Sequence, residues 1–109
     1  MVTSAYEPLS AMDSSFLVFE DPNTHMHVGG AAIFDAGPLR VRGGGIDIDA
    51  IRAYIGSRLQ HVPRYRQRLA FTPIENWPVW VDDPDFDIRY HIRHAGLPEP
   101  GGDQQLADL

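Results

Sequence analysis

The sequence contains no cysteine and no lysine, and it has no long apolar run. Without cysteine, the chain can form neither disulfides nor thiolate metal sites, and a cytoplasmic location is the default expectation. No apolar stretch approaches the roughly 18 residues that a membrane-spanning helix needs, so any membrane contact is expected to be peripheral. Residues 1–10 also lack the basic and apolar regions of a signal peptide.

The charge balance is acidic and the composition is that of a globular chain. Fifteen acidic residues against nine arginines give a formal net charge of −6, which disfavours nucleic acid because phosphate neutralisation needs a basic surface. With 109 residues and 43% hydrophobic residues, the chain is predicted to form at most one small α/β domain. The use of arginine alone is typical of a GC-rich bacterial genome.

Two segments carry the signals of a helix start. Ser10 can cap a short helix, with Asp13 at the third helical position. Asp47 and Asp49 begin the second segment, which Pro63 ends. Its apolar residues recur at helical spacing and are Ile48, Ile51, Ile55, Leu59 and Val62. The sequence therefore predicts one short helix and one main amphipathic helix.

Four segments have the pattern of strands. Residues 26–34 are small and apolar on both faces, so this strand should be covered on both sides or lie against another backbone. Residues 64–69 alternate and would place three arginines on one face. Residues 77–82 are predicted to form a short strand, and residues 86–93 show the clearest half-buried alternation. We expect a mixed sheet from these segments, with a glycine-rich loop at residues 37–45.

The last residues favour a helix that continues. After the linker Pro98–Gly102, Asp103 can cap a helix from Gln104 to Leu109, and no glycine or other C-cap signal follows. We therefore expect the chain to be a truncated or cleaved part of a longer polypeptide, incomplete without downstream sequence.

Histidine and serine offer the first candidates for chemistry. His25 and His27 would point to the same side of a strand and could hold a metal jointly, but structural zinc normally has four protein ligands. The favoured interpretation is a hydrogen-bonded His27 and a surface His25. The other candidates are interpreted as ordinary surface residues, and they are Ser10, Ser14, Ser15, His91 and His94.

Arginine and glycine offer two more candidates. Arg64, Arg66 and Arg68 could hold the phosphates of a nucleotide or of coenzyme A, because guanidinium groups match phosphate oxygens. Pairing with an acidic cluster is the favoured alternative, and that cluster is Asp82, Asp83, Asp85 and Asp87. Gly29 and Gly30 allow a neighbouring backbone or an acyl chain to approach closely, and close packing is the favoured explanation.

Six segments occur in an order and spacing that is similar to a known family. They are Leu9–Leu17, Met26–Gly30, Pro63–Leu69, Trp77–Asp82, Phe86–Arg93 and Pro98–Gly102. Together they resemble the start of the bacterial wax ester synthase/diacylglycerol acyltransferase family. The resemblance implies a chloramphenicol acetyltransferase-like fold, in which residues 1–109 form the N-terminal part of the first two-layer sandwich lobe.

The resemblance also implies an activity. Members transfer a fatty acyl group from acyl-CoA, as co-substrate and without a further cofactor, to a long-chain alcohol or diacylglycerol. Their motif H-H-x-x-x-D-G supplies the general base. This chain has neither adjacent histidines nor an Asp-Gly dipeptide, so no catalytic or metal-binding residue is carried over to it.

The family motifs that are present lead to six substrate-site predictions. The residues expected to line the acyl tunnel are Met12, Phe16, Met26, His27, Gly29 and Gly30. The expected partners are the remainder of the same enzyme, a lipid surface contacted peripherally at the inner membrane or lipid inclusions, and a second copy. Two alternatives remain open: a non-catalytic lipid- or partner-binding module, and a small metal-binding protein.

Overall fold

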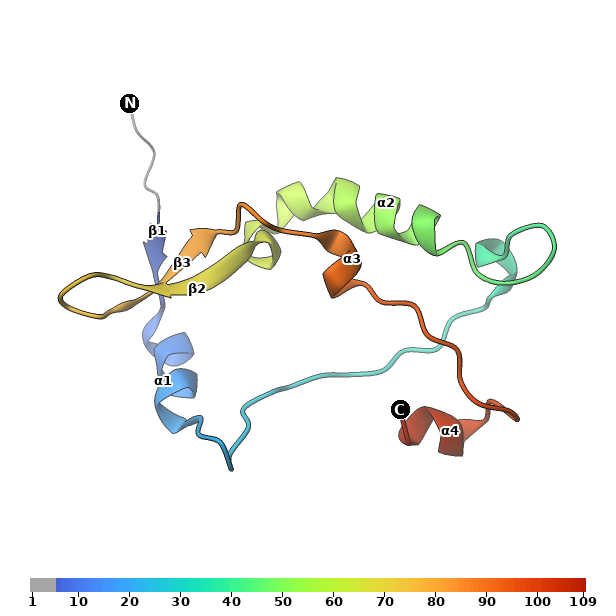
Figure 1. The fold of residues 1–109 in the computed structure, drawn as a ribbon, viewed down its shortest axis with the longest axis horizontal. Coiled ribbons are helices and arrows are strands. Elements are labelled where there is room, and N and C mark those ends of the chain that lie inside the picture. Colours follow the sequence, from blue (N-terminus) through green and yellow to red (C-terminus); the bar gives the residue numbers. More distant parts are fainter. Residues whose placement is uncertain (1–5) are drawn as a thin grey trace.

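The computed structural model describes residues 6–109 and contains both helices and strands (Figure 1). In chain order, its strands and α-helices are β1 (Tyr6–Pro8), α1 (Ala11–Phe19), α2 (Ile48–Arg58), β2 (Gln67–Phe71), β3 (Pro78–Asp82), α3 (Ile88–His91) and α4 (Asp103–Ala107). Short 3-10 helices lie at Gly37–Leu39, Leu59–His61 and Pro63–Arg66.

The three strands form one antiparallel sheet in the order β1-β3-β2. Leu69 pairs with Trp80, and Tyr6 pairs with Val81. Because both pairs of neighbouring strands are antiparallel, the prediction of a mixed sheet is wrong for residues 6–109. The predicted strand at residues 77–82 is confirmed as β3, and its Val79 is 4% exposed at the centre of the sheet.

The first two predicted helices are confirmed together with their caps. The Ser10 side chain accepts a hydrogen bond from the Asp13 N–H at 3.1 Å, which satisfies one free donor of the first turn of α1. Asp47 does the same for the Ala50 N–H at 3.0 Å in α2. α2 tightens into a 3-10 turn before Pro63, where the helix was expected to end. The helix predicted near the C-terminus is α4, with Gly102 rather than Asp103 at its N-cap.

For local reasons, one strand prediction fails and another is confirmed only in part. Residues 86–93 alternate in polarity, yet residues 88–91 form helix α3. The Asp87 side chain accepts a hydrogen bond from the Arg89 N–H at 2.9 Å, and this cap starts a helical turn that no neighbouring strand competes with. Residues 63–66 likewise form a 3-10 turn that begins at Pro63, so β2 starts only at Gln67.

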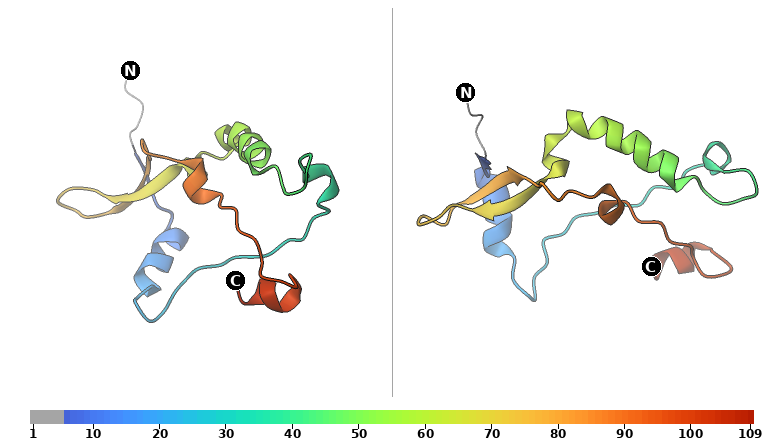
Figure 2. Two further views of the ribbon diagram at one scale, coloured as in Figure 1. Left: turned by 45° about the vertical axis from the view of Figure 1, so that its right-hand side comes forward. Right: turned by 45° about the horizontal axis from the view of Figure 1, so that its top comes forward.

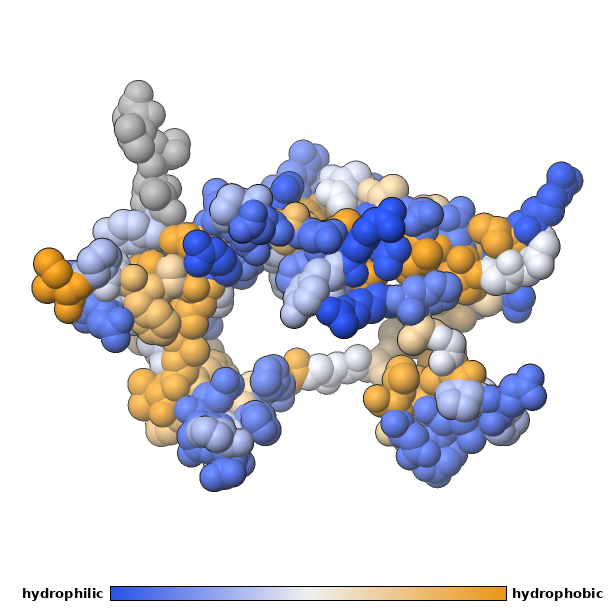
Figure 3. Space-filling model, viewed as in Figure 1, coloured by the Kyte–Doolittle hydropathy of each residue, from blue (hydrophilic) through white to orange (hydrophobic). Residues whose placement is uncertain are grey.

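The elements enclose very little core. Within residues 6–109, Leu59 and Val79 are the only buried hydrophobic residues. The radius of gyration is 18.5 Å, whereas a compact domain of this length has about 13 Å. Figure 2 shows α1, the sheet, α2 and α4 spread around the molecule rather than stacked in closed layers. Figure 3 accordingly shows apolar side chains on the surface around α1 and the sheet.

The segment that the sequence predicted as a strand at residues 26–34 is extended but belongs to no sheet. It crosses from the end of α1 toward the 3-10 turn at Gly37–Leu39 (Figure 1). The strand itself is therefore not formed here, because no other described strand lies beside this segment.

Candidate functional site

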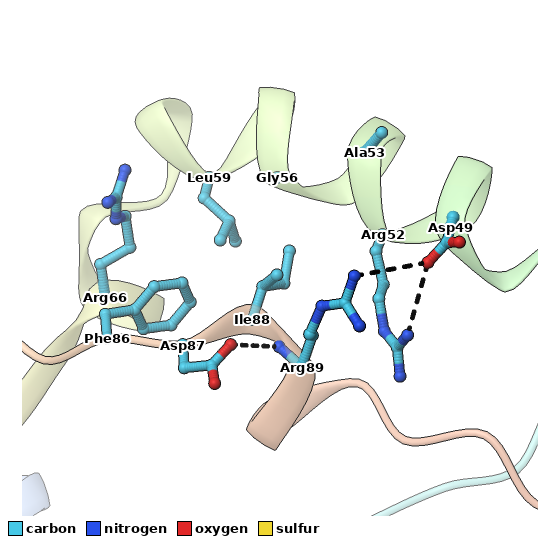
Figure 4. Close-up of a pocket in the computed structure, with 10 residues that line it drawn as sticks. All are labelled: Asp49, Arg52, Ala53, Gly56, Leu59, Arg66, Phe86, Asp87, Ile88 and Arg89. Atoms are coloured by element: carbon cyan, nitrogen blue, oxygen red, sulfur yellow. Dashed lines mark hydrogen bonds and ion pairs between the residues drawn. The ribbon is translucent and has the colours of Figure 1, made fainter.

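A polar pocket of about 560 Å³ lies between α2 and the segment leading into α3 (Figure 4). Gly56, in the last turn of α2, lies close to Ile88, because a Cβ there would lie 3.3 Å from Cδ1 of Ile88. Leu59, at the end of α2, is 8% exposed and closes the apolar end of the pocket. The pocket is therefore the place where two segments about forty residues apart in sequence are joined.

Arg52 carries most of the polar connection across this pocket. Its Nε and Nη2 atoms donate to the backbone carbonyl of Ile92 at 3.0 and 2.9 Å. Its Nη1 atom also lies 3.7 Å from a carboxylate oxygen of Asp49, and Arg89 lies 3.9 Å from the same oxygen. The guanidinium of Arg52 is thus committed to holding the chain after α3 against α2.

Carboxylates are the only candidate bases in the lining of this pocket. It contains no serine, histidine, cysteine or tyrosine, so it offers no nucleophile or general base of the usual kinds except carboxylates. Asp87 caps α3 and Asp49 faces two guanidinium groups, so both carboxylates already have structural partners. We interpret the pocket as a structural junction, with Arg52 and Gly56 as its determining residues.

Sequence reasoning did not single out either residue, although each left a signal. Arg52 lies three residues after Asp49, a spacing that places the two charges side by side on a helix. Gly56 interrupts a run of good helix formers, which indicates a close approach by another segment.

The arginines expected on one strand face have separate structural partners. Arg64 stacks over the Trp80 ring at 4.7 Å and pairs with Glu7 at 3.3 Å, and Arg66 lies over the Phe86 ring at 5.3 Å. Arg68 is exposed and forms no ion pair within residues 6–109. They therefore form no common phosphate site. The predicted pairing with the acidic cluster Asp82, Asp83, Asp85 and Asp87 is also wrong, because within residues 6–109 none of these arginines forms an ion pair with the cluster.

The candidate histidines and serines form no catalytic pair in the described part of the chain. The ring centroids of His25 and His27 lie 6.0 Å apart, and residues 6–109 contain no group of three or more metal-ligating side chains. His91 stacks on Phe86 at 5.0 Å. The Ser15 hydroxyl donates to the carbonyl of Met12 at 2.6 Å, within α1. Ser15 and His91 therefore serve local structure, whereas His27 is exposed and forms no hydrogen bond within residues 6–109, so the expectation of a hydrogen-bonded His27 is wrong.

The six residues predicted to line an acyl tunnel lie on two separate elements. Met12 and Phe16 are on α1, 72% and 42% exposed. The other four, Met26, His27, Gly29 and Gly30, lie on the extended segment that follows. Nothing lies within 4 Å of a Cβ built at Gly29 or Gly30. The residues therefore remain a predicted lining, in which the two glycines leave room beside the backbone.

Two apolar clefts flank this extended segment. One, of about 590 Å³, lies between residues 34–40 and the face of α2 formed by Ile51, Tyr54 and Ile55. The other, of about 600 Å³, lies between residues 30–34 and α4, with Leu106 in its wall. Phe34 lines both clefts. Their apolar walls suit hydrocarbon or apolar side chains, and neither contains a histidine or serine.

Comparison with known proteins identifies the family. Residues 9–109 match the family described as wax ester synthase/diacylglycerol acyltransferase catalytic domain, so the chain belongs to this family. Over 102 residues it is 42% identical to the Mycobacterium tuberculosis (strain H37Rv) protein named probable diacylglycerol O-acyltransferase tgs3. Over 104 residues it is 36% identical to the protein of the same strain named probable diacylglycerol O-acyltransferase tgs1.

These alignments cover nearly all of this chain and a minor part of each relative. They include 93% of this chain in both cases, but 36% of tgs3 and 21% of tgs1. The chain therefore spans about a third of the length of the first relative and about a fifth of the second. No solved structure matches the chain. None of the helices in residues 6–109 has the length and apolar character that crossing a bilayer requires.

Proposed function

We propose that this chain contributes the N-terminal part of a catalytic domain that makes wax esters or triacylglycerols. The observation that supports this most directly is the family match over residues 9–109. The names of tgs3 and tgs1 favour diacylglycerol as an acceptor, and the family description adds long-chain alcohols. Acyl-CoA is the proposed donor, with no other cofactor.

In the proposed reaction, a base removes the proton of the acceptor hydroxyl and the oxygen attacks the thioester carbonyl of acyl-CoA. The new C–O bond forms, the C–S bond breaks, and coenzyme A leaves as a thiolate that takes up the proton. Because the thioester is already activated, positioning, proton removal and oxyanion stabilisation suffice. Neither apolar cleft contains a histidine, and the Asp47 carboxylate in one of them is engaged in capping α2, so in this proposal the remainder of the domain supplies the base.

The contribution of this chain in the proposal is an apolar wall for the substrate. The proposed lining residues are Met12, Phe16, Met26, His27, Gly29 and Gly30. Their exposure and the absence of atoms around the two glycines leave space for a hydrocarbon chain once other parts of the domain close over them. In this proposal the chain is part of a chloramphenicol acetyltransferase-like lobe, cytoplasmic, in peripheral contact with the inner membrane or lipid inclusions, and able to form homo-oligomers.

A chimera tests the proposal. In the tgs3 chimera, this chain replaces the matched 102 residues of tgs3. We expect it to form ester from palmitoyl-CoA and dioleoylglycerol or hexadecanol, as tgs3 itself should, whereas tgs3 without the matched residues should form none. A folded chimera that binds lipid but forms no ester, beside an active tgs3, would support a lipid-binding module instead.

A further inference from the structure

The segment of residues 27–34, here called the unpaired segment, has backbone groups without protein partners. Within residues 6–109, none of its eight N–H groups and none of its eight C=O groups forms a hydrogen bond with the protein. The neighbouring Met26 N–H reaches only a side chain, the Glu20 carboxylate at 3.4 Å. At about 3.3 Å per residue, the unpaired segment offers roughly 26 Å of backbone for strand pairing.

Its side chains are also poorly covered. Val28, Ile33 and Phe34 are 93%, 82% and 77% exposed. Apolar residues on both faces are typical of a strand that is covered on both sides. The segment contains no lysine, no proline and no carboxylate, the features that natural proteins use to protect an edge strand. A strand of this composition is therefore expected to be paired along both of its edges.

The two apolar clefts show how a sheet would fit around this strand. Phe34 lies in the cleft beside α2, and residues 30–34 lie in the cleft beside α4. Ile51 and Ile55 on α2 and Leu106 on α4 face these clefts without filling them. A sheet built on the unpaired segment would give both helices an apolar surface to pack on.

We propose that the unpaired segment is an internal strand, paired on both edges by strands from the part of the catalytic domain that lies outside these 109 residues. This inference rests on the proposed function, since it takes the rest of that domain as its partner. The relative tgs3 is long enough to contain such partner strands, because this chain spans only 36% of it. The partner strands carry apolar side chains, since both faces of the segment are apolar.

A second copy of this chain fits the surface less well. It would place Gly29–Ala32 of one copy against the same small residues of the other, so little apolar surface would be buried between the two segments. The excess accessible surface of this chain is also larger than an interface between two copies would bury. The accessible area is 9,533 Å², about 3,500 Å² more than the roughly 6,000 Å² of a compact monomer of this mass. A standard interface buries only about 1,600 Å² in total.

Hydrogen exchange in the tgs3 chimera and in the isolated chain tests this inference. We expect amides 28–34 to exchange at least ~100-fold more slowly in the chimera than in the isolated chain. Fast exchange in a folded chimera would overturn the inference. Protection that instead appears in the isolated chain when its concentration is raised tenfold would identify a second copy as the partner, and would overturn it too.

Proline substitutions test whether both edges are paired. Ala31→Pro and Ala32→Pro each remove one N–H, and neighbouring N–H groups of a strand point to opposite edges. Each should lower the folded-to-unfolded ratio of the chimera at least ~10-fold. The matched control, Ala11→Pro, lies at the first position of α1 after an extended Ser10 and should change it less than about twofold. If only one of the two strand variants is impaired, the segment is an edge strand and the two-edge proposal fails.

Exchange and activity separate this inference from the proposed function. A chimera that forms ester while amides 28–34 exchange rapidly would keep the function and overturn the strand pairing. Slow exchange in a folded chimera that forms no ester would keep the strand pairing and overturn the function.

Discussion

Separating this chain from the rest of a catalytic domain should abolish cooperative folding. The accessible area of 9,533 Å² is about 3,500 Å² above that of a compact monomer of 12.2 kDa. At about 25 cal/mol per Å², a few hundred Å² of apolar surface correspond to ~5–10 kcal/mol, which is as large as the net stability of a typical domain. Leu59 and Val79 are the only buried hydrophobic residues of the described chain. Burial within the chain therefore cannot replace the stabilisation that the exposed apolar surface fails to provide.

Urea and heat unfolding of the isolated 109-residue chain measure this effect. We expect circular dichroism to change gradually without a sigmoidal transition, and a hydrophobic dye such as ANS to bind before any denaturant is added. The tgs3 chimera is the control, and it should unfold in a defined transition. A sharp transition of the isolated chain, with an m-value of ~1 kcal/mol/M or more in urea and a radius of gyration near 13 Å in solution, would refute this reasoning.

Substitutions at Gly56, Arg52 and Ser10 of the tgs3 chimera, followed by urea unfolding, test the local contacts. Gly56→Ala should be neutral or stabilise the chimera by up to ~0.5 kcal/mol, because helix propensity improves and the terminal methyl of Ile88 can move. Gly56→Leu should destabilise it by more than ~1 kcal/mol by displacing α3. An unchanged stability with leucine would contradict the close approach of α3 to Gly56. Arg52→Lys should lower the free energy of unfolding by ~1 kcal/mol, because the two hydrogen bonds to the Ile92 carbonyl are lost. The control Arg68→Lys, at an exposed position, should have no measurable effect. Equal effects of the two variants would contradict the role given to Arg52. Ser10→Ala should lower the free energy of unfolding by ~1 kcal/mol, whereas Ser10→Asp, which keeps a capping oxygen, should not. An unchanged stability with alanine would show that the cap of α1 does not stabilise the fold.

The elements that the sequence predicted correctly are those with local signals. α1 and α2 have side-chain caps at Ser10 and Asp47, and both caps act within three residues in sequence. β3 forms a hairpin with β2, so its partner lies close along the chain. Short-range interactions of this kind can be predicted from neighbouring residues, because they do not depend on the rest of a domain.

The elements that the sequence predicted wrongly depend on partners far along the chain. The alternation at residues 86–93 would be stable as a strand only beside another strand, and without one the cap at Asp87 turns residues 88–91 into a helix. Residues 26–34 stay extended but unpaired. Strand patterns describe which faces can be buried, whereas pairing has to be supplied by another segment.

The candidate site was predictable only as a set of motifs. The family resemblance is confirmed by the match over residues 9–109. The predicted tunnel lining stays a prediction, because α1 and the extended segment do not close around a common cavity on their own. The junction formed by Arg52 and Gly56 was missed, since a contact with a carbonyl forty residues away leaves no simple spacing in the sequence.

Ester formation by the tgs3 chimera is the most direct measurement of the proposed role of this chain. Palmitoyl-CoA labelled in the acyl group and dioleoylglycerol would be the substrates, with free thiol measured in the same reaction. We expect labelled triacylglycerol and coenzyme A thiol to appear in a one-to-one ratio, and only when this chain or the matched part of tgs3 is present. A folded chimera that releases no thiol and forms no labelled ester, under conditions in which tgs3 does both, would contradict the proposal.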